Sequence, residues 1–214
     1  MVHTNKKQGF TVIELSIAAI VLALLMGVSY KIFSGASLGF QRSTKSLTMQ
    51  NEMRNGLNFI REEMQRASYK SKIRINGNII YDAYKFSLCK DSEINGNSSG
   101  KALAKWFICK PFTKDSGVVF ECTLKVVDNK ILYTKVVNEG SDSSEPLFQN
   151  KVVISQIGKI RLSTEDITSG TGSEVIGALI NIETFAVDST KGQADLNVSA
   201  QTGAKVEVKV VKEL

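Results

Sequence analysis

An apolar run near the N-terminus constrains this chain more than any other feature. It extends from Phe10 to Tyr30, reads FTVIELSIAAIVLALLMGVSY and carries a single charge, that of Glu14. A helix of this length spans roughly 30 Å at 1.5 Å per residue, which is the thickness of the hydrocarbon core of a bilayer. Lys6 and Lys7 precede the run, and by the positive-inside rule they keep the short N-terminus in the cytoplasm. The run therefore predicts one membrane-crossing helix.

Glu14 costs free energy at this position, because an ionised carboxylate near the bilayer is unfavourable unless it has a partner. Nothing basic lies within about one helical turn of it once the leader with Lys6 and Lys7 is removed. A cut between Gly9 and Phe10 would create a new α-amino group about a turn away, on the same chain or on a neighbouring subunit. A tolerated acid at the membrane interface is the simpler alternative.

A cleaved secretory signal is the competing interpretation of the run. A basic segment followed by an apolar stretch is common to signals and anchors. The run is long for the apolar region of a signal, and no A-x-A-like site ends it, since MGVSYKIFSGAS offers only a loose cluster of small residues. The pattern favours an anchor that is retained.

The composition argues against an enzyme. The chain has 214 residues, 43% of them hydrophobic, which is enough for a packed core. Its one histidine, His3, lies ahead of the apolar run, so a mature form without the leader has no imidazole for triad or zinc chemistry. The formal net charge is +6, but Lys and Arg are scattered along the chain, so specific nucleic-acid binding is not expected.

The downstream pattern predicts an α+β fold, in which a long N-terminal helix packs on a predominantly antiparallel β head. Met49, Met53, Leu57, Ile60, Met64 and Ala67 recur at helical spacing. Arg54, Arg61, Glu62, Glu63 and Arg66 are expected on the other faces. The helix should end near residue 69, and two glycines predict a weak stretch at about 34–39. We expect a leader over 1–9, a membrane or filament-core helix over 10–33, its amphipathic continuation over 34–69 and a head over 70–214.

Short β-branched or alternating runs follow residue 70. Ile73-Arg74-Ile75 and Ile79-Ile80-Tyr81 flank Asn76-Gly77, a strong hairpin signal because both central residues tolerate positive φ. A second hairpin is expected around Asp128-Asn129. The other expected strands are Tyr84 to Cys89, Leu103 to Cys109, Val118 to Val127, Ile131 to Val137, Val152 to Leu162, Val175 to Val187, Leu196 to Ser199 and Val206 to Val211.

Three polar loops are candidates for ligand binding. Residues 91–97, DSEINGN, partly resemble an EF-hand loop, with oxygen ligands at Asp91, Glu93 and Asn95. The bidentate acid required at the twelfth position is replaced by Ala102. A solvated turn is therefore favoured over a calcium site, and no cofactor is expected. The segments 139–145 and 163–174 are also rich in carboxylates.

The three cysteines show no CxxC or metal-ligand spacing. Cys109 and Cys122 fall opposite one another if the chain turns about Asp115-Ser116, and export to an oxidising compartment would permit a disulfide between them. Cys89 with Cys109 is an alternative pairing, and free thiols are a third.

The N-terminal segment resembles a known signal. KKQGFTVIELSIA is similar to the class III signal of type IV prepilins and type II secretion pseudopilins, with a short basic leader, Gly9, aromatic Phe10 and Glu14 four residues later. The resemblance covers about the first 35 residues. It implies that a prepilin peptidase cuts between Gly9 and Phe10 and N-methylates Phe10. It also implies that Glu14 pairs with the N-terminal amine of a neighbouring subunit during assembly.

The resemblance implies partners and a location as well. The protein would be a single-pass protein of the bacterial inner membrane, with its N-terminus cytoplasmic and its head periplasmic. An inner-membrane assembly platform would then place it among other minor and major pilins or pseudopilins, at the filament tip.

The size of the head favours a minor subunit. A head of about 145 mostly β residues resembles those of J-type pseudopilins and W-type minor pilins, and the membrane helix lacks the proline found in many major pilins. We therefore predict a subunit that primes a type IV pilus or a type II secretion pseudopilus. The alternatives are a tip subunit that binds DNA or a surface, a signal-anchored periplasmic protein unrelated to filaments, and a membrane-anchored enzyme.

Overall fold

The computed structural model describes residues 11–69, 71–75, 78–81, 86–109, 119–138, 146–170, 174–188 and 193–211. The chain divides into two units, Met1–Leu47 and Thr48–Leu214. The helix α1 spans Val12–Gln65. The strands are β1 (Ser71–Ile75), β2 (Asn78–Tyr81), β3 (Ser87–Leu88), β4 (Glu93–Asn95), β5 (Ser99–Cys109), β6 (Val119–Val127), β7 (Lys130–Asn138), β8 (Pro146–Ile154), β9 (Ile157–Thr168), β10 (Val175–Asp188), β11 (Gln193–Glu207) and β12 (Lys209–Val211).

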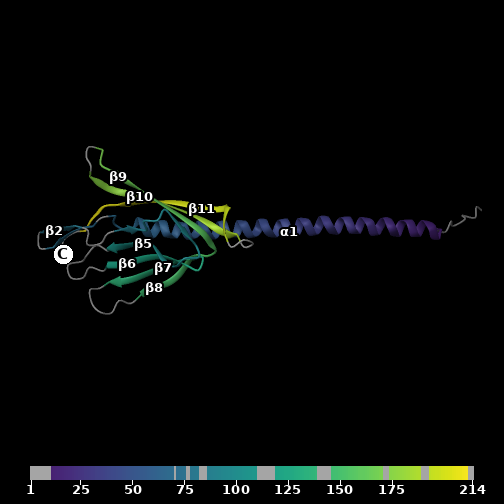
Figure 1. The fold of residues 1–214 in the computed structure, drawn as a ribbon, viewed down its shortest axis with the longest axis horizontal. Helices are drawn as coiled ribbons and strands as arrows, with labels where there is room; N and C mark the ends of the chain where they lie inside the picture. The colour runs from purple at the N-terminus through teal and green to yellow at the C-terminus, as the bar shows by residue number, and fades with distance from the viewer. Residues whose placement is uncertain are drawn as a thin grey trace, which may run out of the picture. The chain divides into compact units, whose positions relative to one another are not determined.

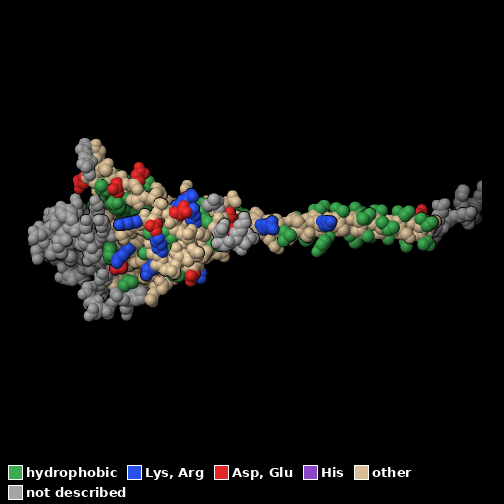
Figure 2. All heavy atoms as spheres, viewed as in Figure 1, with side chains coloured by type: hydrophobic (Ala, Val, Ile, Leu, Met, Phe, Trp, Pro, Cys, Tyr) green, Lys and Arg blue, Asp and Glu red, His purple; other side chains and the backbone are tan. Residues whose placement is uncertain are grey.

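The part of α1 in the first unit is apolar and exposed. Among the described residues, α1 is the one helix long and apolar enough to cross a membrane, with a mean hydropathy of 2.4 in its most apolar window and none of that window buried. Figure 2 shows hydrophobic side chains along this segment. The helix continues through residues 34–39, so the two glycines there do not interrupt it. It ends at Gln65, earlier than expected.

The described strands of the head form three sheets, and the α+β prediction is confirmed. The five-stranded sheet has the order β3-β5-β6-β7-β8, the four-stranded sheet β11-β10-β9-β4, and the three-stranded sheet β12-β1-β2. All neighbours are antiparallel except β1 and β12, which are parallel. In Figure 1, β5 to β8 lie on one side of the C-terminal part of α1, and β9 to β11 lie on the other.

One hydrophobic core joins the helix to both large sheets. The stripe predicted from helical periodicity is buried, since Met53, Leu57, Ile60 and Met64 are at most 1% exposed. The five-stranded sheet contributes a stack of aromatic rings, in which Trp106 lies 6.0 Å from both Phe86 and Tyr133 between ring centroids. The four-stranded sheet contributes mainly aliphatic side chains, namely Ile157, Ile160, Ile180 and Val206.

Both predicted hairpins are confirmed where the structure describes them. Ile73 pairs with Ile80 and Ile75 with Asn78, while the turn residues 76 and 77 lie outside the described residues. At the second hairpin, Asp128 and Asn129 have φ values of 47° and 62°, as its tight turn requires.

Several expected boundaries are wrong. The segment 163–174, expected as a polar loop, begins within a strand, because β9 continues to Thr168. The run from Val152 to Leu162 is two strands, because Gln156 adopts a φ of 56° and the chain passes there from the five-stranded to the four-stranded sheet. Conversely, the two strands expected between 196 and 211 largely join as β11, which continues through Gly203. The polar segment 91–97 contains the strand β4, because Ile94 is buried against the core.

Candidate functional site

A capping box begins α1 at the position where the sequence predicts an assembly site. The backbone N–H of Thr11 donates to Glu14 Oε2 at 2.9 Å, and the Thr11 hydroxyl donates to the same oxygen at 3.0 Å. The backbone N–H of Glu14 donates in return to Thr11 Oγ1 at 3.3 Å. This reciprocal Thr-x-x-Glu arrangement satisfies backbone donors that a helix start otherwise leaves unpaired. Glu14 therefore has a partner within its own chain.

The capping box leaves part of the carboxylate available. Both hydrogen bonds from Thr11 end on Oε2, and a carboxylate accepts on two oxygens. A cation could therefore approach Oε1 without displacing Thr11. Lys6, Lys7, Gly9 and Phe10 lie outside the described residues, so cleavage, methylation and the pairing of Glu14 with an amine stay predictions.

One comparison with known proteins bears on this segment. A family model described as the prokaryotic N-terminal methylation motif matches residues 4–30. The match supports a type IV pilin-like or pseudopilin protein. Such a motif implies processing by a prepilin peptidase and assembly with other pilins, and it is a structural rather than a catalytic feature. It is also consistent with an anchor in the membrane. No curated protein and no solved structure matches the chain significantly.

Glu63 links α1 to the five-stranded sheet through hydrogen bonds to β7. Its side chain is buried, although the sequence places it on a polar face of the helix. Glu63 Oε2 accepts hydrogen bonds from the Tyr133 hydroxyl at 2.5 Å and from Lys135 Nζ at 3.0 Å, and Oε1 accepts one from Arg66 at 2.9 Å. The Tyr133 hydroxyl also lies 3.2 Å from Cys122 Sγ. The network joins residues from α1, β6 and β7.

Burial and hydrogen bonding oppose one another in this network. Burial raises the pKa of the Glu63 carboxyl, but the hydrogen bonds from Tyr133 and Lys135 and the charges of Lys135 and Arg66 outweigh it and hold the pKa below its ordinary value. Burial, with its hydrogen bonds to Cys122 and Glu63, raises the pKa of Tyr133. Burial also raises the pKa of the Cys122 thiol to about 11. Glu63 is therefore charged at neutral pH, whereas Tyr133 and Cys122 are protonated.

A second link between α1 and the sheets lies about three turns nearer the N-terminus of the helix. Glu52 Oε1 accepts hydrogen bonds from the Ser155 backbone N–H at 3.0 Å and from its hydroxyl at 2.5 Å. Gly56 lies beside the same corner, and a Cβ there would come within 2.2 Å of Ile154 Cγ1 and 2.6 Å of the Val153 carbonyl oxygen. Gly56 thus allows close approach of the helix to the corner that links β8 to β9.

Two of the three candidate calcium ligands form ion pairs within the chain. Asp91 pairs with Lys101, and Glu93 pairs with Lys159 at 2.5 Å and with Arg161 at 3.3 Å. Asn95 is the third residue of β4, where it pairs with Lys159 in the strand register. Within the described ranges, no three His, Cys, Asp or Glu residues are grouped so that they could hold a metal ion. A calcium ion at Asp91 or Glu93 would have to displace lysine or arginine.

The predicted opposition of Cys109 and Cys122 is wrong. Cys122 pairs with Trp106 in the register of β5 and β6, whereas Cys109 pairs with Val119. This register is favoured because it brings the buried residues Trp106 and Cys122 together on the core side of the sheet. Cys89 and Cys122 are both free thiols in this structure.

Proposed function

We propose that this protein is a minor pilin or minor pseudopilin without catalytic activity of its own. In this proposal the leader over residues 1–9 is removed between Gly9 and Phe10, Phe10 is N-methylated, and the protein is held in the inner membrane with its head in the periplasm. It then joins the filament at or near the tip and primes assembly. The methylation motif over residues 4–30 is the observation that carries the proposal.

The exposed helix supports an assembly role. Apolar side chains such as Leu24, Leu25 and Ile32 are each at least 60% exposed in the lone chain, so they need lipid or other helices around them. A subunit stored in the membrane covers these side chains with lipid, and a filament core covers them with neighbouring helices. The segments proposed for these roles are residues 10–33 and, beyond the membrane, residues 34–69.

Glu14 would change partners on assembly. In the lone subunit its carboxylate accepts hydrogen bonds from Thr11. In the filament, the N-terminal amine of a neighbour would add an opposite charge, and an ion pair away from water forms favourably only when its geometry is complete. Glu14 would thereby favour the assembled over the misaligned state, through contact with other minor and major subunits on the assembly platform.

The head supports a minor subunit of the J-type pseudopilin or W-type minor pilin kind. Its described strands form two large sheets around one core, and α1 enters that core directly. The helix that would pack into the filament is therefore continuous with the helical segment in the core of the head. Such a head would form the outer contacts of a tip subunit.

Glu14→Val tests the proposal in a bacterium that assembles the filament. We expect normal membrane insertion and normal processing at Gly9, but a severalfold lower yield in sheared filaments or in crosslinks to other subunits. Thr11→Ala is the matched control, because it removes the cap at a cost of about 1 kcal/mol in helix stability while keeping the carboxylate. The proposal is wrong if Glu14→Val enters filaments like the wild type, as a signal-anchored periplasmic protein unrelated to filaments would predict.

A further inference from the structure

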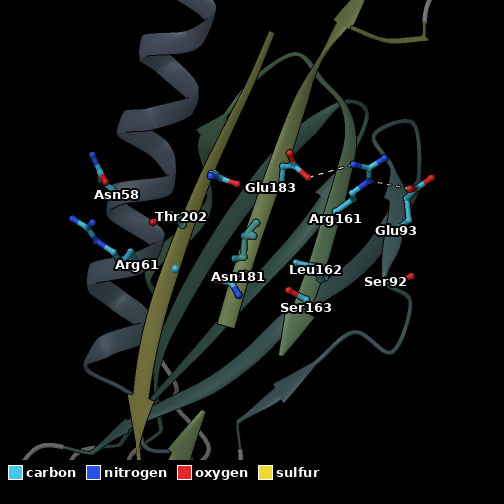
Figure 3. A pocket seen from close by; sticks show the side chains of 13 residues that line it. Asn58, Arg61, Ser92, Glu93, Arg161, Leu162, Ser163, Asn181, Glu183 and Thr202 are labelled. Atoms are coloured by element: carbon cyan, nitrogen blue, oxygen red, sulfur yellow. Dashed lines mark hydrogen bonds and ion pairs between the residues drawn. The ribbon is translucent and has the colours of Figure 1, made fainter. Parts of the chain in front are cut away.

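A polar groove on the outer face of the four-stranded sheet has no role in assembly as described above. It has a volume of about 880 Å³ and is open along one side. Its floor is formed by β9, β10 and β11, and its borders by α1 and by the start of β4, as Figure 3 shows. We propose that this groove binds a neutral, hydroxyl-rich chain, namely an oligosaccharide.

The floor of the groove has room for a ligand at β11, because Gly203 has no side chain to fill it. Ser163, Asn181 and Gly203 lie side by side across three strands in the register of the sheet. A Cβ at position 203 would lie 2.9 Å from Asn181 Oδ1, so any side chain there would displace the amide. The floor therefore exposes a hydroxyl and an amide with free space above them. Both groups can donate and accept hydrogen bonds, as sugar hydroxyls require.

In the neighbouring row of residues across the floor, a hydrogen-bond donor, Arg161, lies beside two carboxylate acceptors. Arg161 lies between Glu93, at 3.3 Å, and Glu183, at 3.5 Å, and these contacts are drawn in Figure 3. Its guanidinium also stacks 4.9 Å above the ring of Phe185, which is buried beneath it. The three charged groups thus lie in mutual contact on the floor of the groove. A guanidinium next to a carboxylate matches neighbouring hydroxyls, one of which accepts while the other donates.

The groove extends across the sheet from the start of β4 to α1. Asn58 and Arg61 border it, and Arg61 forms no ion pair with a carboxylate among the described residues. A second hollow of about 360 Å³ shares Glu183 and Gln201 with the groove and extends to Arg54, one turn further along the same helix face. The two adjoining polar hollows together suit several linked sugar units better than a compact ligand.

The same lining disfavours the other ligand classes. The aliphatic residues in the lining, Leu162 and Ile182, are at most 5% exposed, so an apolar ligand would cover polar groups without compensation. An anionic polymer would meet the carboxylates of Glu93 and Glu183, and a cationic ligand would meet Arg61 and Arg161. A ligand without net charge avoids both penalties. The inference concerns the head alone and does not depend on incorporation into a filament.

Titration calorimetry on the full chain tests the inference. The detergent should carry no sugar, such as lauryldimethylamine oxide, because a maltoside headgroup would compete. Maltohexaose, cellohexaose and chitohexaose are the probes, and we expect saturable one-to-one binding of at least one. Gly203→Val should weaken that binding at least tenfold by filling the floor. Gly170→Val is the matched control and should bind like the wild type, because nothing lies within 4 Å of a Cβ there.

The fold of the variant is checked by thermal unfolding. Only the mobile end of the Asn181 side chain stands close to the new Cβ, so Gly203→Val should unfold like the wild type. If it is less stable, Asn181→Ala removes the amide without adding bulk, and the same loss of binding is expected. The inference is overturned if none of the three probes binds, if both variants bind like the wild type, or if polyphosphate binds more tightly than every sugar.

Discussion

Removal of the Glu63 carboxylate should destabilise the head strongly. Glu63 is 6% exposed, and its partner Lys135 has a side chain that is 13% exposed. In Glu63→Ala the ammonium of Lys135 loses its carboxylate, and the buried hydroxyl of Tyr133 keeps only the weak thiol contact of Cys122. Breaking a buried ion pair by removing one partner costs about 3–5 kcal/mol. Lys135 Nζ also lies 5.1 Å from the centroid of the Phe120 ring, and this cation–π contact remains in the variant. The lower end of that energy range is therefore expected. We expect a loss of about 3 kcal/mol.

The single tryptophan makes this loss measurable. Trp106 is fully buried and stacks on Tyr133, so its fluorescence during guanidinium unfolding of the full chain in detergent reports on this region of the head. Glu62→Ala, one position away and exposed, is the matched control and should change stability by no more than about 0.5 kcal/mol. The double variant Glu63→Leu with Lys135→Met should recover part of the loss, because an apolar pair of similar volume replaces the ion pair while the Tyr133 hydroxyl still lacks its carboxylate partner.

Two results would refute the reasoning. If Glu63→Ala costs less than about 1 kcal/mol, the network does not fasten the helix to the sheet. If the double variant is as unstable as Glu63→Ala, then the loss comes from packing around the side chain and not from an unpaired charge.

Three further outcomes follow from the same contacts. Gly56→Ala should destabilise the head by about 1–2 kcal/mol in the fluorescence assay. The new Cβ would crowd the Val153 carbonyl oxygen, and this cost outweighs the gain in helix propensity. A stabilised variant would contradict this. The lowered pKa of Glu63 stabilises the fold above the unfolded value of about 4.3, and this contribution is lost as pH falls through the folded pKa. The unfolding midpoint should therefore fall more steeply below about pH 4.5 in the wild type than in the double variant. Cys122 should resist alkylation at pH 8 until the protein unfolds, as read by peptide mass spectrometry, because it is buried and its pKa is about 11; labelling of the folded protein there would count against the structure.

Periodicity was sufficient to predict the main elements. The apolar stripe from Met53 to Met64 forms the buried face of α1, and the turn at Asp128-Asn129 lies where its sequence places it. Both are local properties, since helical spacing and tolerance of positive φ are carried by the residues themselves. The capping spacing of Thr11 and Glu14 is equally local and visible in the sequence, although neither sequence-based interpretation of Glu14, a partner for an amine or a tolerated acid, includes it.

Contacts between distant residues could not be predicted in this way. Glu63 bonds to Tyr133, which is 70 positions away, so nothing near it in sequence marks it as buried. The corner at Ser155 interrupts an apolar run because Glu52 holds it, again across a long separation. The strand register that separates Cys109 from Cys122 follows from which side chains the core accepts. The polar groove likewise exists only once Gly203 lies beside Asn181.

Cleavage after Gly9 is tested most directly by the intact mass of the protein purified from a bacterium with a prepilin peptidase. The proposed processing removes residues 1–9 and adds one methyl group to the amine of Phe10, so we expect the mass of residues 10–214 with one methylation. A strain without the peptidase should yield the uncut chain. An unprocessed N-terminus in the presence of the peptidase, or a cut near Ser37, would contradict the assignment to a pilin-like filament.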